Sequence, residues 1–592
     1  MALIQKHPRL ITALSIIMTA VAAPFLIPEN PDSAVYRTGT LCVLLLFGCM
    51  QPVWYALTHA DRRTLFAGIC WGFLFSCALS IGSELFFYDG LLKDPSSLPR
   101  RFSVPFLMTP MLGILSTRLM IIRRGKTRQP TQIPYFVFFA AIMLMWLPVL
   151  LGHYPGMLNY DFVGEYSQHL QKSYSNIHPL LHSAVMNGII SIGERMGDPT
   201  LGVLLMSLFQ MAAFAAALSY GCTFAQRHGA PLWSLVLMTL FFGLHPIFAA
   251  LSVSMTKDTL FSAAVVALSL QVFEIIEDPS AYLARKRNWA LFIFLMINTA
   301  LMRNNGIFAL ALMLPALLLT AKGYRKQVIL LCGSGALASV LVFSGLSAVY
   351  QPETMPSFQL YSLPAQQLVR AYNLGDMTDE ERAELEDWYT SENGLILYPH
   401  LADGAKGYLD RPRLQIEGEK FLDLWNRVGE RNAHEYAEAL LMLNIGSWYP
   451  DDLTHSIIYP DHRWRNMGYL QTDDQDMSEY GIISRNILPS VERFYQKICH
   501  NNEYQKYPLI TLLFCTATPF WVILFSCALL CARRQSRLLP GTLGALGLWL
   551  SYLFGPCTLP RYTLPLFCLA PVLLITALCL PALNKTGKEL AP

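Results

Sequence analysis

The sequence predicts an all-α polytopic membrane protein (about 14 transmembrane helices) with a soluble polar domain inserted between its late helices. Composition is the first observation, because 53% of the 592 residues are hydrophobic and only 14% are charged. The second is that apolar runs of about 20 residues, long enough to cross a bilayer, recur along the chain. The third is one long polar segment, residues 349–507, which holds 26 of the 41 acidic residues.

The apolar runs predict about fourteen transmembrane helices. The first follows Lys6, His7 and Arg9 and lacks a small-residue cleavage site, so we interpret it as a retained helix and not as a signal peptide. The expected spans are 10–28, 39–59, 64–87, 104–122, 133–152, 200–223, 231–252, 259–277, 288–302, 306–321, 328–348, 508–531, 539–556 and 563–582.

Cationic connections predict the orientation of these spans, since Lys and Arg are enriched in cytoplasmic loops. Residues 178–196 are interrupted by polar side chains, and we expect them to form a helix in the outer interface and not a span. With that assignment the cationic loops lie on the cytoplasmic side together with both termini: 62–63, 123–128, 227, 285–287, 322–326 and 533–534. Four segments then share the outer face: 153–199, 253–258, 303–305 and 557–562.

The chain divides into four expected parts. Residues 1–132 are N-terminal transmembrane helices, 133–348 form a transmembrane module with the outer loop 153–199, 349–507 form an extracytoplasmic soluble domain, and 508–592 are C-terminal helices. The polar segment is long enough for a small domain with its own core. A net charge of +3 without a long basic tract does not indicate nucleic-acid binding.

Three carboxylates stand out: Asp161, Glu165 and Asp258 lie at outer membrane ends in apolar surroundings. Charges at a membrane edge tend to be paired or functional, and Asp161 is the candidate general base. The alternative is that Asp161 caps the following helix. Glu165 lies four residues later, on the same face if the loop is helical, and is the reserve candidate for the base or a partner of a sugar hydroxyl.

Three cations, Lys257, Arg303 and Arg561, are expected at the same outer surface. Arg binds phosphate bidentately and Lys binds it as a point charge, so their convergence predicts a phosphate site. Taken singly, each cation is more often a snorkelling anchor at a helix end, and only their convergence favours a site. His178 could bond the donor phosphate or the acceptor, and the histidines show no metal-ligand spacing, so no metal ligand is assigned.

One carboxylate beside a cationic phosphate pocket favours a particular reaction. A glycosidase needs two carboxyl groups, one of which protonates a poor leaving group. A lipid phosphate leaves as a stable anion, so one base and the cations suffice. The expected result is a single displacement at the anomeric carbon with inversion.

These motifs resemble the GT-C superfamily of lipid-phosphate-sugar-dependent glycosyltransferases, which includes protein O-mannosyltransferases and aminoarabinose–lipid A transferases. The resemblance rests on Asp161, His178-Pro179, Lys257-Asp258, Arg303-Asn304-Asn305 and Arg561-Tyr562, and it covers about residues 133–348 and 508–582. Two features depart from the pattern: five spans precede the catalytic loop, and the soluble domain lies between late spans instead of at the C-terminus.

The resemblance implies an inverting transferase in the bacterial cytoplasmic membrane, with its active site outside. Its donor would be a polyprenyl-phosphate sugar and its acceptor an extracytoplasmic glycan, lipid or protein, and a divalent cation (Mg²⁺ or Mn²⁺) would be compatible with the chemistry. Glu165, His178, Asp258, Asn304 and Tyr562 would support the site. Two alternatives are a polysaccharide polymerase or ligase and a lipid or glycan transporter, although a transporter should place charges near the bilayer midplane.

Overall fold

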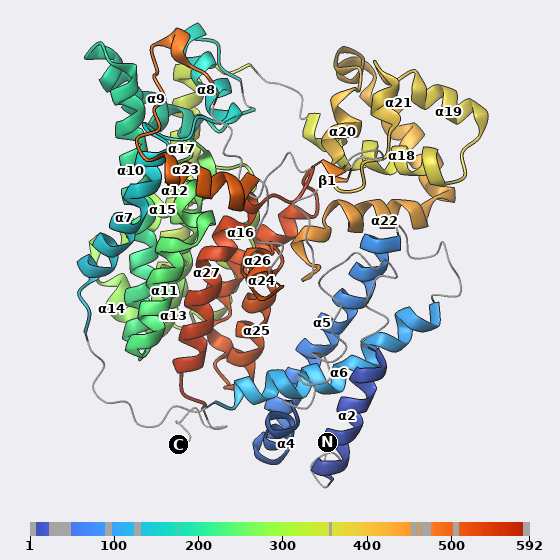
Figure 1. The fold of residues 1–592 in the computed structure, drawn as a ribbon. Helices are drawn as coiled ribbons and strands as arrows, with labels where there is room; N and C mark the ends of the chain where they lie inside the picture. The colour runs from blue at the N-terminus through green and yellow to red at the C-terminus, as the bar shows by residue number, and fades with distance from the viewer. Residues whose placement is uncertain are drawn as a thin grey trace.

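In a computed structural model, the chain is an all-α membrane protein (Figure 1). The structure describes residues 7–22, 49–88, 98–122, 132–175, 177–353, 358–450, 457–458, 463–464, 475–500 and 508–583. Both ends of the described chain lie at one end of the helical bundle, and the helices α8, α9 and α18 to α22 lie toward the other (Figure 1). The predicted cationic loop 123–128 and residues 39–48 of the predicted span 39–59 fall outside the described residues.

The helices are bounded as follows: α2 Pro8–Ala22, α4 Met50–His59, α5 Arg62–Tyr88, α6 Leu98–Met120, α7 Tyr135–Gly152, α8 Tyr160–Gln171, α9 Leu180–Arg195, α10 Pro199–Arg227, α11 Leu232–Leu244, α12 Pro246–Val253, α13 Lys257–Glu277, α14 Pro279–Leu283, α15 Lys286–Leu301, α16 Gly306–Thr320, α17 Arg325–Tyr350, α18 Ser362–Leu374, α19 Asp379–Glu386, α20 Ala402–Gly407, α21 Arg411–Arg431, α22 Ala433–Leu443, α23 Pro489–Tyr495, α24 Pro508–Phe514, α25 Thr518–Ala532, α26 Pro540–Tyr552 and α27 Pro560–Cys579. Two two-residue strands, β1 (Ile457–Ile458) and β2 (Arg463–Trp464), pair antiparallel.

Among the described residues, seven helices are long and apolar enough to cross a membrane, or eight if the pair α11 and α12 is one bent span. The predicted count of about fourteen is therefore not supported by the described helices. Helices do form at most of the predicted positions, but several are short: α16 and α25 have 15 residues each and α26 has 13. Apolar composition located these helices without fixing their lengths.

The break between α11 and α12 bends the pair by 48° at His245-Pro246. Proline cannot continue a helix because it lacks an N–H and clashes with the preceding turn. The His245 Nδ1 accepts a hydrogen bond from the Ile247 N–H at 3.2 Å and so caps the second helix. This bend brings the end of α12 toward the loop that precedes α13.

Helix α13 is the centre of the bundle, since it packs against α10, α15, α26 and α27 and most of its apolar segment is buried. By contrast, α17 exposes most of its apolar surface. The helix expected to lie in the interface, residues 178–196, is observed as α9, which is absent from the set of span-length apolar helices and packs beside α8, α10 and α17.

Helices α18 to α22 form a unit with a core of their own, built around Leu368, Trp388, Phe421 and Leu424. The predicted domain 349–507 is not one unit, however. Residues 475–500 fold back onto the bundle, where the Arg485 N–H donates to the Tyr154 carbonyl at 2.7 Å and the Gln475 N–H donates to the Leu158 carbonyl at 2.8 Å. Polar composition marked both parts equally and did not indicate that they pack in different places.

Helices α5 and α6 approach closely where glycines face each other. A Cβ atom at Gly72 would collide with the backbone of Gly113, and small residues are what permits such close crossings in membranes. We expect Gly72→Ala to lower the free energy of unfolding by about 1–3 kcal/mol through overpacking. Thermal unfolding in detergent measures this. Gly333→Ala in α17 is the control, because a Cβ there meets nothing within 4 Å; equal stability of the two variants would contradict the crossing.

Candidate active site

Helix α8 follows α7 after a short loop and carries Asp161 in its first turn. The helix cap is Asn159, whose side-chain oxygen accepts from the Phe162 N–H at 3.0 Å, while its Nδ2 donates to the Ser254 Oγ at 3.1 Å. The alternative that Asp161 serves as the helix cap is therefore wrong. Its carboxylate is left for other partners.

A short backbone ladder fixes the loop before α8 against the loop before α13. The Met157 N–H donates to the Val253 carbonyl at 2.9 Å, and the Met255 N–H donates back to the Met157 carbonyl at 3.0 Å. Buried Gln210 supports the second loop, since its Nε2 donates to the carbonyls of Leu251, Ser252 and Ser254. These bonds place the first turn of α8 beside Lys257, the first residue of α13.

The Asp161 carboxylate lies between two cations from distant segments. Its Oδ2 accepts from the Lys257 Nζ at 3.1 Å and from the Arg561 Nη1 at 2.9 Å. Arg561 also donates to the Tyr160 hydroxyl, and its guanidinium carbon lies 5.2 Å from the centre of the Tyr160 ring. All three predicted residues are therefore together, in the first turns of α8, α13 and α27.

The third predicted cation, Arg303, has a different ion-pair partner. Arg303 pairs with Asp258, not with Asp161. Its guanidinium lies 4.7 Å from the centre of the Tyr562 ring, and the Arg561 guanidinium lies 5.2 Å from the centre of the same ring. The Tyr552 hydroxyl donates to the Tyr562 carbonyl at 2.5 Å and fixes this segment. Both guanidinium groups therefore contact the Tyr562 ring.

The electrostatics of Asp161 follow from this enclosure. Burial by itself would raise the pKa of Asp161, but the charges of Arg561 and Lys257 outweigh burial and hold the pKa well below its ordinary value. The three residues also stand at helix N-termini, where the partial positive charge of the backbone adds to that of the side chains. The cluster is thus an anion-binding arrangement whose anion is Asp161.

Glu165 lies one turn further along α8 and is fully enclosed. Its Oε2 accepts from the Ser183 Oγ at 2.7 Å and lies 2.8 Å from the His182 Nδ1, and its Oε1 lies 3.6 Å from the His178 Nδ1. Burial would raise the pKa of Glu165, but the charge and hydrogen bond of His182 outweigh burial and lower the pKa. Glu165 joins α8 to the start of α9.

His178 lies against Gly164, where an added Cβ would be 3.1 Å from the His178 Nε2. Burial lowers the pKa of His178 below its usual value. The imidazole is therefore neutral at physiological pH, beside the helix turn that separates Asp161 from Glu165.

The two asparagines that follow Arg303 differ in their surroundings. Asn304 is exposed, and the structure does not bring it to the Asp161 carboxylate. Its neighbour Asn305 is half-buried and donates to the Ser551 Oγ at 3.2 Å, so it joins α16 to α26.

The unit of helices α18 to α22 contacts the loop that precedes α27 and Arg561. The Ala402 N–H donates to the Pro556 carbonyl at 2.8 Å, and the Asn444 Nδ2 donates to the Leu553 carbonyl at 2.8 Å. Tyr398 and Leu401 pack with Cys557 in a small apolar cluster that also touches Tyr562. This unit therefore packs against the segment that leads into Arg561.

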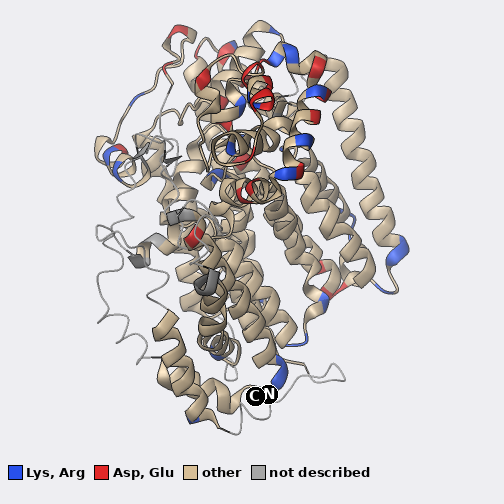
Figure 2. Ribbon diagram, turned by 90° about the vertical axis from the view of Figure 1, so that its right-hand side faces the viewer, with Lys and Arg blue, Asp and Glu red and all other residues tan. Residues whose placement is uncertain are grey.

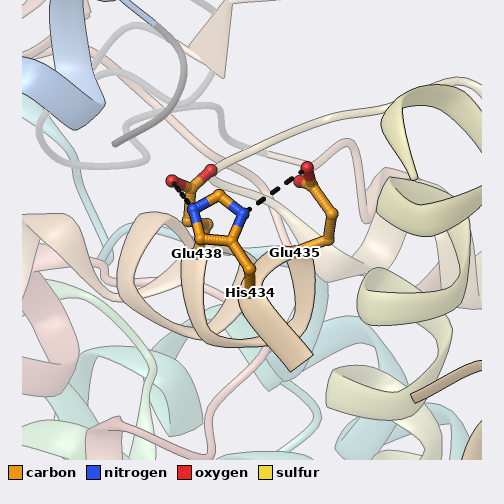
Figure 3. Close-up of side chains that lie close together, drawn as sticks. All are labelled: His434, Glu435 and Glu438. Atoms are coloured by element: carbon orange, nitrogen blue, oxygen red, sulfur yellow. Dashed lines mark ion pairs between the residues drawn. The ribbon is translucent and has the colours of Figure 1, made fainter. Parts of the chain in front are cut away.

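One group of potential metal ligands occurs in the part of the chain that the structure describes: His434, Glu435 and Glu438 on α22 (Figure 3). Fully buried Arg370 of α18 pairs with both carboxylates, at 2.7 Å from the Glu435 Oε2. The Nε2 of His434 lies 2.9 Å from Glu438. Because a guanidinium already neutralises these carboxylates, the group is best described as an ion-pair network that holds α18 against α22.

Sequence reasoning missed three contributors to the site: the cap Asn159, the Arg561 partner Tyr160 and the Glu165 partner Ser183. Tyr160 adjoins Asp161, so adjacency was an available signal for it. Asn is a preferred residue at helix starts, so a local signal for Asn159 was available as well. Ser183 acts through a contact between separate segments, which no local pattern indicates.

The buried Glu165 cluster makes a testable prediction about stability. We expect Glu165→Gln to lower the free energy of unfolding by about 1.5–3 kcal/mol, because it removes the charge that accepts two hydrogen bonds. A carboxyl with a lowered folded-state pKa stabilises above its unfolded pKa, and this contribution is lost as pH falls through the folded value. The difference in melting temperature between wild type and variant should therefore be constant near neutrality and shrink in acid.

Glu380→Gln in the exposed first turn of α19 is the control and should cost little. A Glu165→Gln variant as stable as wild type at pH 7 would contradict the anchoring role.

Comparisons with known proteins give one family match. A family model described as a family of unknown function (DUF6020) matches residues 170–589, which is more than half of the chain. No curated protein and no solved structure matches the chain. The match includes Lys257, Arg303 and Arg561 and begins nine residues after Asp161. The chain belongs to the DUF6020 family.

Proposed function

We propose that this protein is an inverting glycosyltransferase that moves a sugar from a polyprenyl-phosphate donor to an acceptor outside the cytoplasmic membrane. The observation that carries the proposal is the enclosure of the Asp161 carboxylate by Lys257 and Arg561 at the start of three helices. A buried carboxylate beside several cations supplies the two groups that such a transfer needs, a base and a phosphate site.

In the proposed reaction, the Asp161 carboxylate takes the proton of the acceptor hydroxyl. The acceptor oxygen forms a bond to the anomeric carbon as the bond from that carbon to the phosphate oxygen breaks. The phosphate keeps the electron pair and leaves on its lipid as an anion, held by Lys257, Arg561 and Arg303. Asp258 and His178 orient the neighbouring groups, and the Tyr562 ring contacts both guanidinium groups.

The proposed orientation puts the site outside the cytoplasm. Acidic residues gather mainly at the end of the molecule that holds α18 to α22 (Figure 2). Arg227 at the end of α10, Lys286 at the start of α15 and Arg325 at the start of α17 mark helix ends away from the site. By the positive-inside rule those ends face the cytoplasm. In this proposal the shorter helices α16, α25 and α26 complete the membrane part, and the α18 to α22 unit is extracytoplasmic and presents the acceptor.

A donor screen tests the function directly. Purified protein in proteoliposomes is supplied with polyprenyl-phosphate sugars, polyprenyl-diphosphate glycans and nucleotide sugars, and transfer to cell-envelope extracts is followed with a radiolabelled sugar. The proposal expects transfer from the monophosphate donors alone. Turnover of diphosphate glycans alone would favour a polymerase or ligase, and the glycosyltransferase proposal would then be wrong.

The base assignment predicts that Asp161→Asn loses transfer by roughly 10²–10⁴-fold while the protein still folds. Initial rates at saturating donor measure the effect, and the melting temperature in detergent reports folding. A variant with full activity would remove Asp161 from the reaction.

The phosphate assignment predicts that Arg561→Lys lowers kcat/KM for the donor by roughly 100-fold, since one ammonium cannot replace two guanidinium N–H donors aimed at different partners. Arg227→Lys is the matched control, because Arg227 also pairs with a carboxylate, Glu274 at 2.5 Å, but far along α10 from the site. Equal losses in both variants would indicate a general effect on folding.

A further inference from the structure

We propose that the Asp161 carboxylate occupies the position of a phosphate group in the ligand-free protein, so that donor binding displaces it and releases the base. The identity of the ligand as a lipid phosphate rests on the proposed function. The anion position itself rests only on the geometry of Asp161, Lys257 and Arg561.

The number of buried charges supports the exchange. Lys257, Arg303 and Arg561 supply three cations, and Asp161 and Asp258 are the carboxylates that pair with them. The side chains of Lys257 and Arg561 are only 16% and 9% exposed. Cations this deeply buried require an anion close by, and Asp161 meets that requirement for two of them.

The hydrogen bonds of the two cations converge on one atom. Lys257 and Arg561 both donate to the same oxygen, the Asp161 Oδ2, at 3.1 and 2.9 Å. A phosphate oxygen accepts charge-assisted hydrogen bonds with the same geometry and charge. The first turns of α8, α13 and α27 also surround this point, and helix N-termini favour a phosphate in the same way as they favour a carboxylate.

The two ion pairs also determine how basic the Asp161 carboxylate is. A carboxylate held by two cations is a very weak proton acceptor, because protonation would give up both ion pairs. The arrangement in the ligand-free protein therefore cannot deprotonate a hydroxyl. A phosphate that takes over Lys257 and Arg561 removes this restraint, so the carboxylate regains its basicity only when the donor is in place.

This exchange predicts an unusual binding result for Asp161→Asn. The substitution keeps the shape of the side chain but removes the competing charge, so sugar-free polyprenyl phosphate should bind at least about tenfold more tightly than to wild type. Titration of the full-length protein in nanodiscs measures the Kd, with inorganic phosphate and the non-phosphorylated polyprenol as separate arms. If the lipid contributes to affinity, polyprenyl phosphate should be the only one of the three ligands that binds tightly. If the anion site suffices, inorganic phosphate should show the same ratio of Kd values between wild type and variant as polyprenyl phosphate does.

Glu438→Gln is the matched control, since it removes a buried carboxylate of α22 that pairs with Arg370 instead of with the two cations. Its effect on the Kd should be less than about threefold. Lys257→Met removes one of the two cations and should weaken binding. Asp161→Ala serves as a second variant if the Asn variant does not accumulate, and it should tighten binding as well.

Unchanged or weaker phosphate binding in the Asp161 variants would overturn the exchange, and equal tightening in Glu438→Gln would reduce it to a general charge effect. Failure of the two proposals can be distinguished. Tighter binding in Asp161→Asn without transfer by wild type would retain the exchange and reject the transferase. Transfer by wild type without tighter binding would do the opposite.

Discussion

The structure depends on one buried electrostatic constraint: the Asp161 carboxylate must lie where Lys257 and Arg561 can reach it. None of these charges would be stable alone in an apolar surrounding, because desolvation of an unpaired ion costs several kcal/mol or more. The three residues come from the starts of α8, α13 and α27, which are separated by about 100 and 300 residues of chain. Pairing them fixes which helix ends lie together in the bundle.

Several uncharged features serve that constraint. The Asn159 cap frees Asp161 from the role of a helix cap, and the backbone bonds between Met157 and residues 253–255 fix the two loops in register. The pair α11 and α12 is bent by 48° at His245-Pro246, shortly before the loop that leads into α13. The Glu165 cluster then holds the start of α9 against α8, with neutral His178 between the two carboxylates of α8.

The sequence predicted the membership of the site better than its internal pairing. Asp161, Lys257 and Arg561 each adjoin the end of an apolar run, and the positive-inside rule assigns those ends to one face, so their grouping could be inferred without coordinates. That Arg303 would pair with Asp258, or Glu165 with His182, depends on side-chain directions set by packing. The span count failed for a related reason, since hydropathy does not indicate where loops shorten a helix such as α26.

The central claim is that Asp161, Lys257 and Arg561 form one anion site shared between a carboxylate and a phosphate. The most direct measurement is a cryo-electron microscopy structure of the protein in nanodiscs with polyprenyl phosphate bound. The account predicts phosphate oxygens within hydrogen-bond distance of Lys257 and Arg561, with the Asp161 carboxylate turned away from both. A phosphate bound elsewhere, with the Asp161 ion pairs intact, would contradict it.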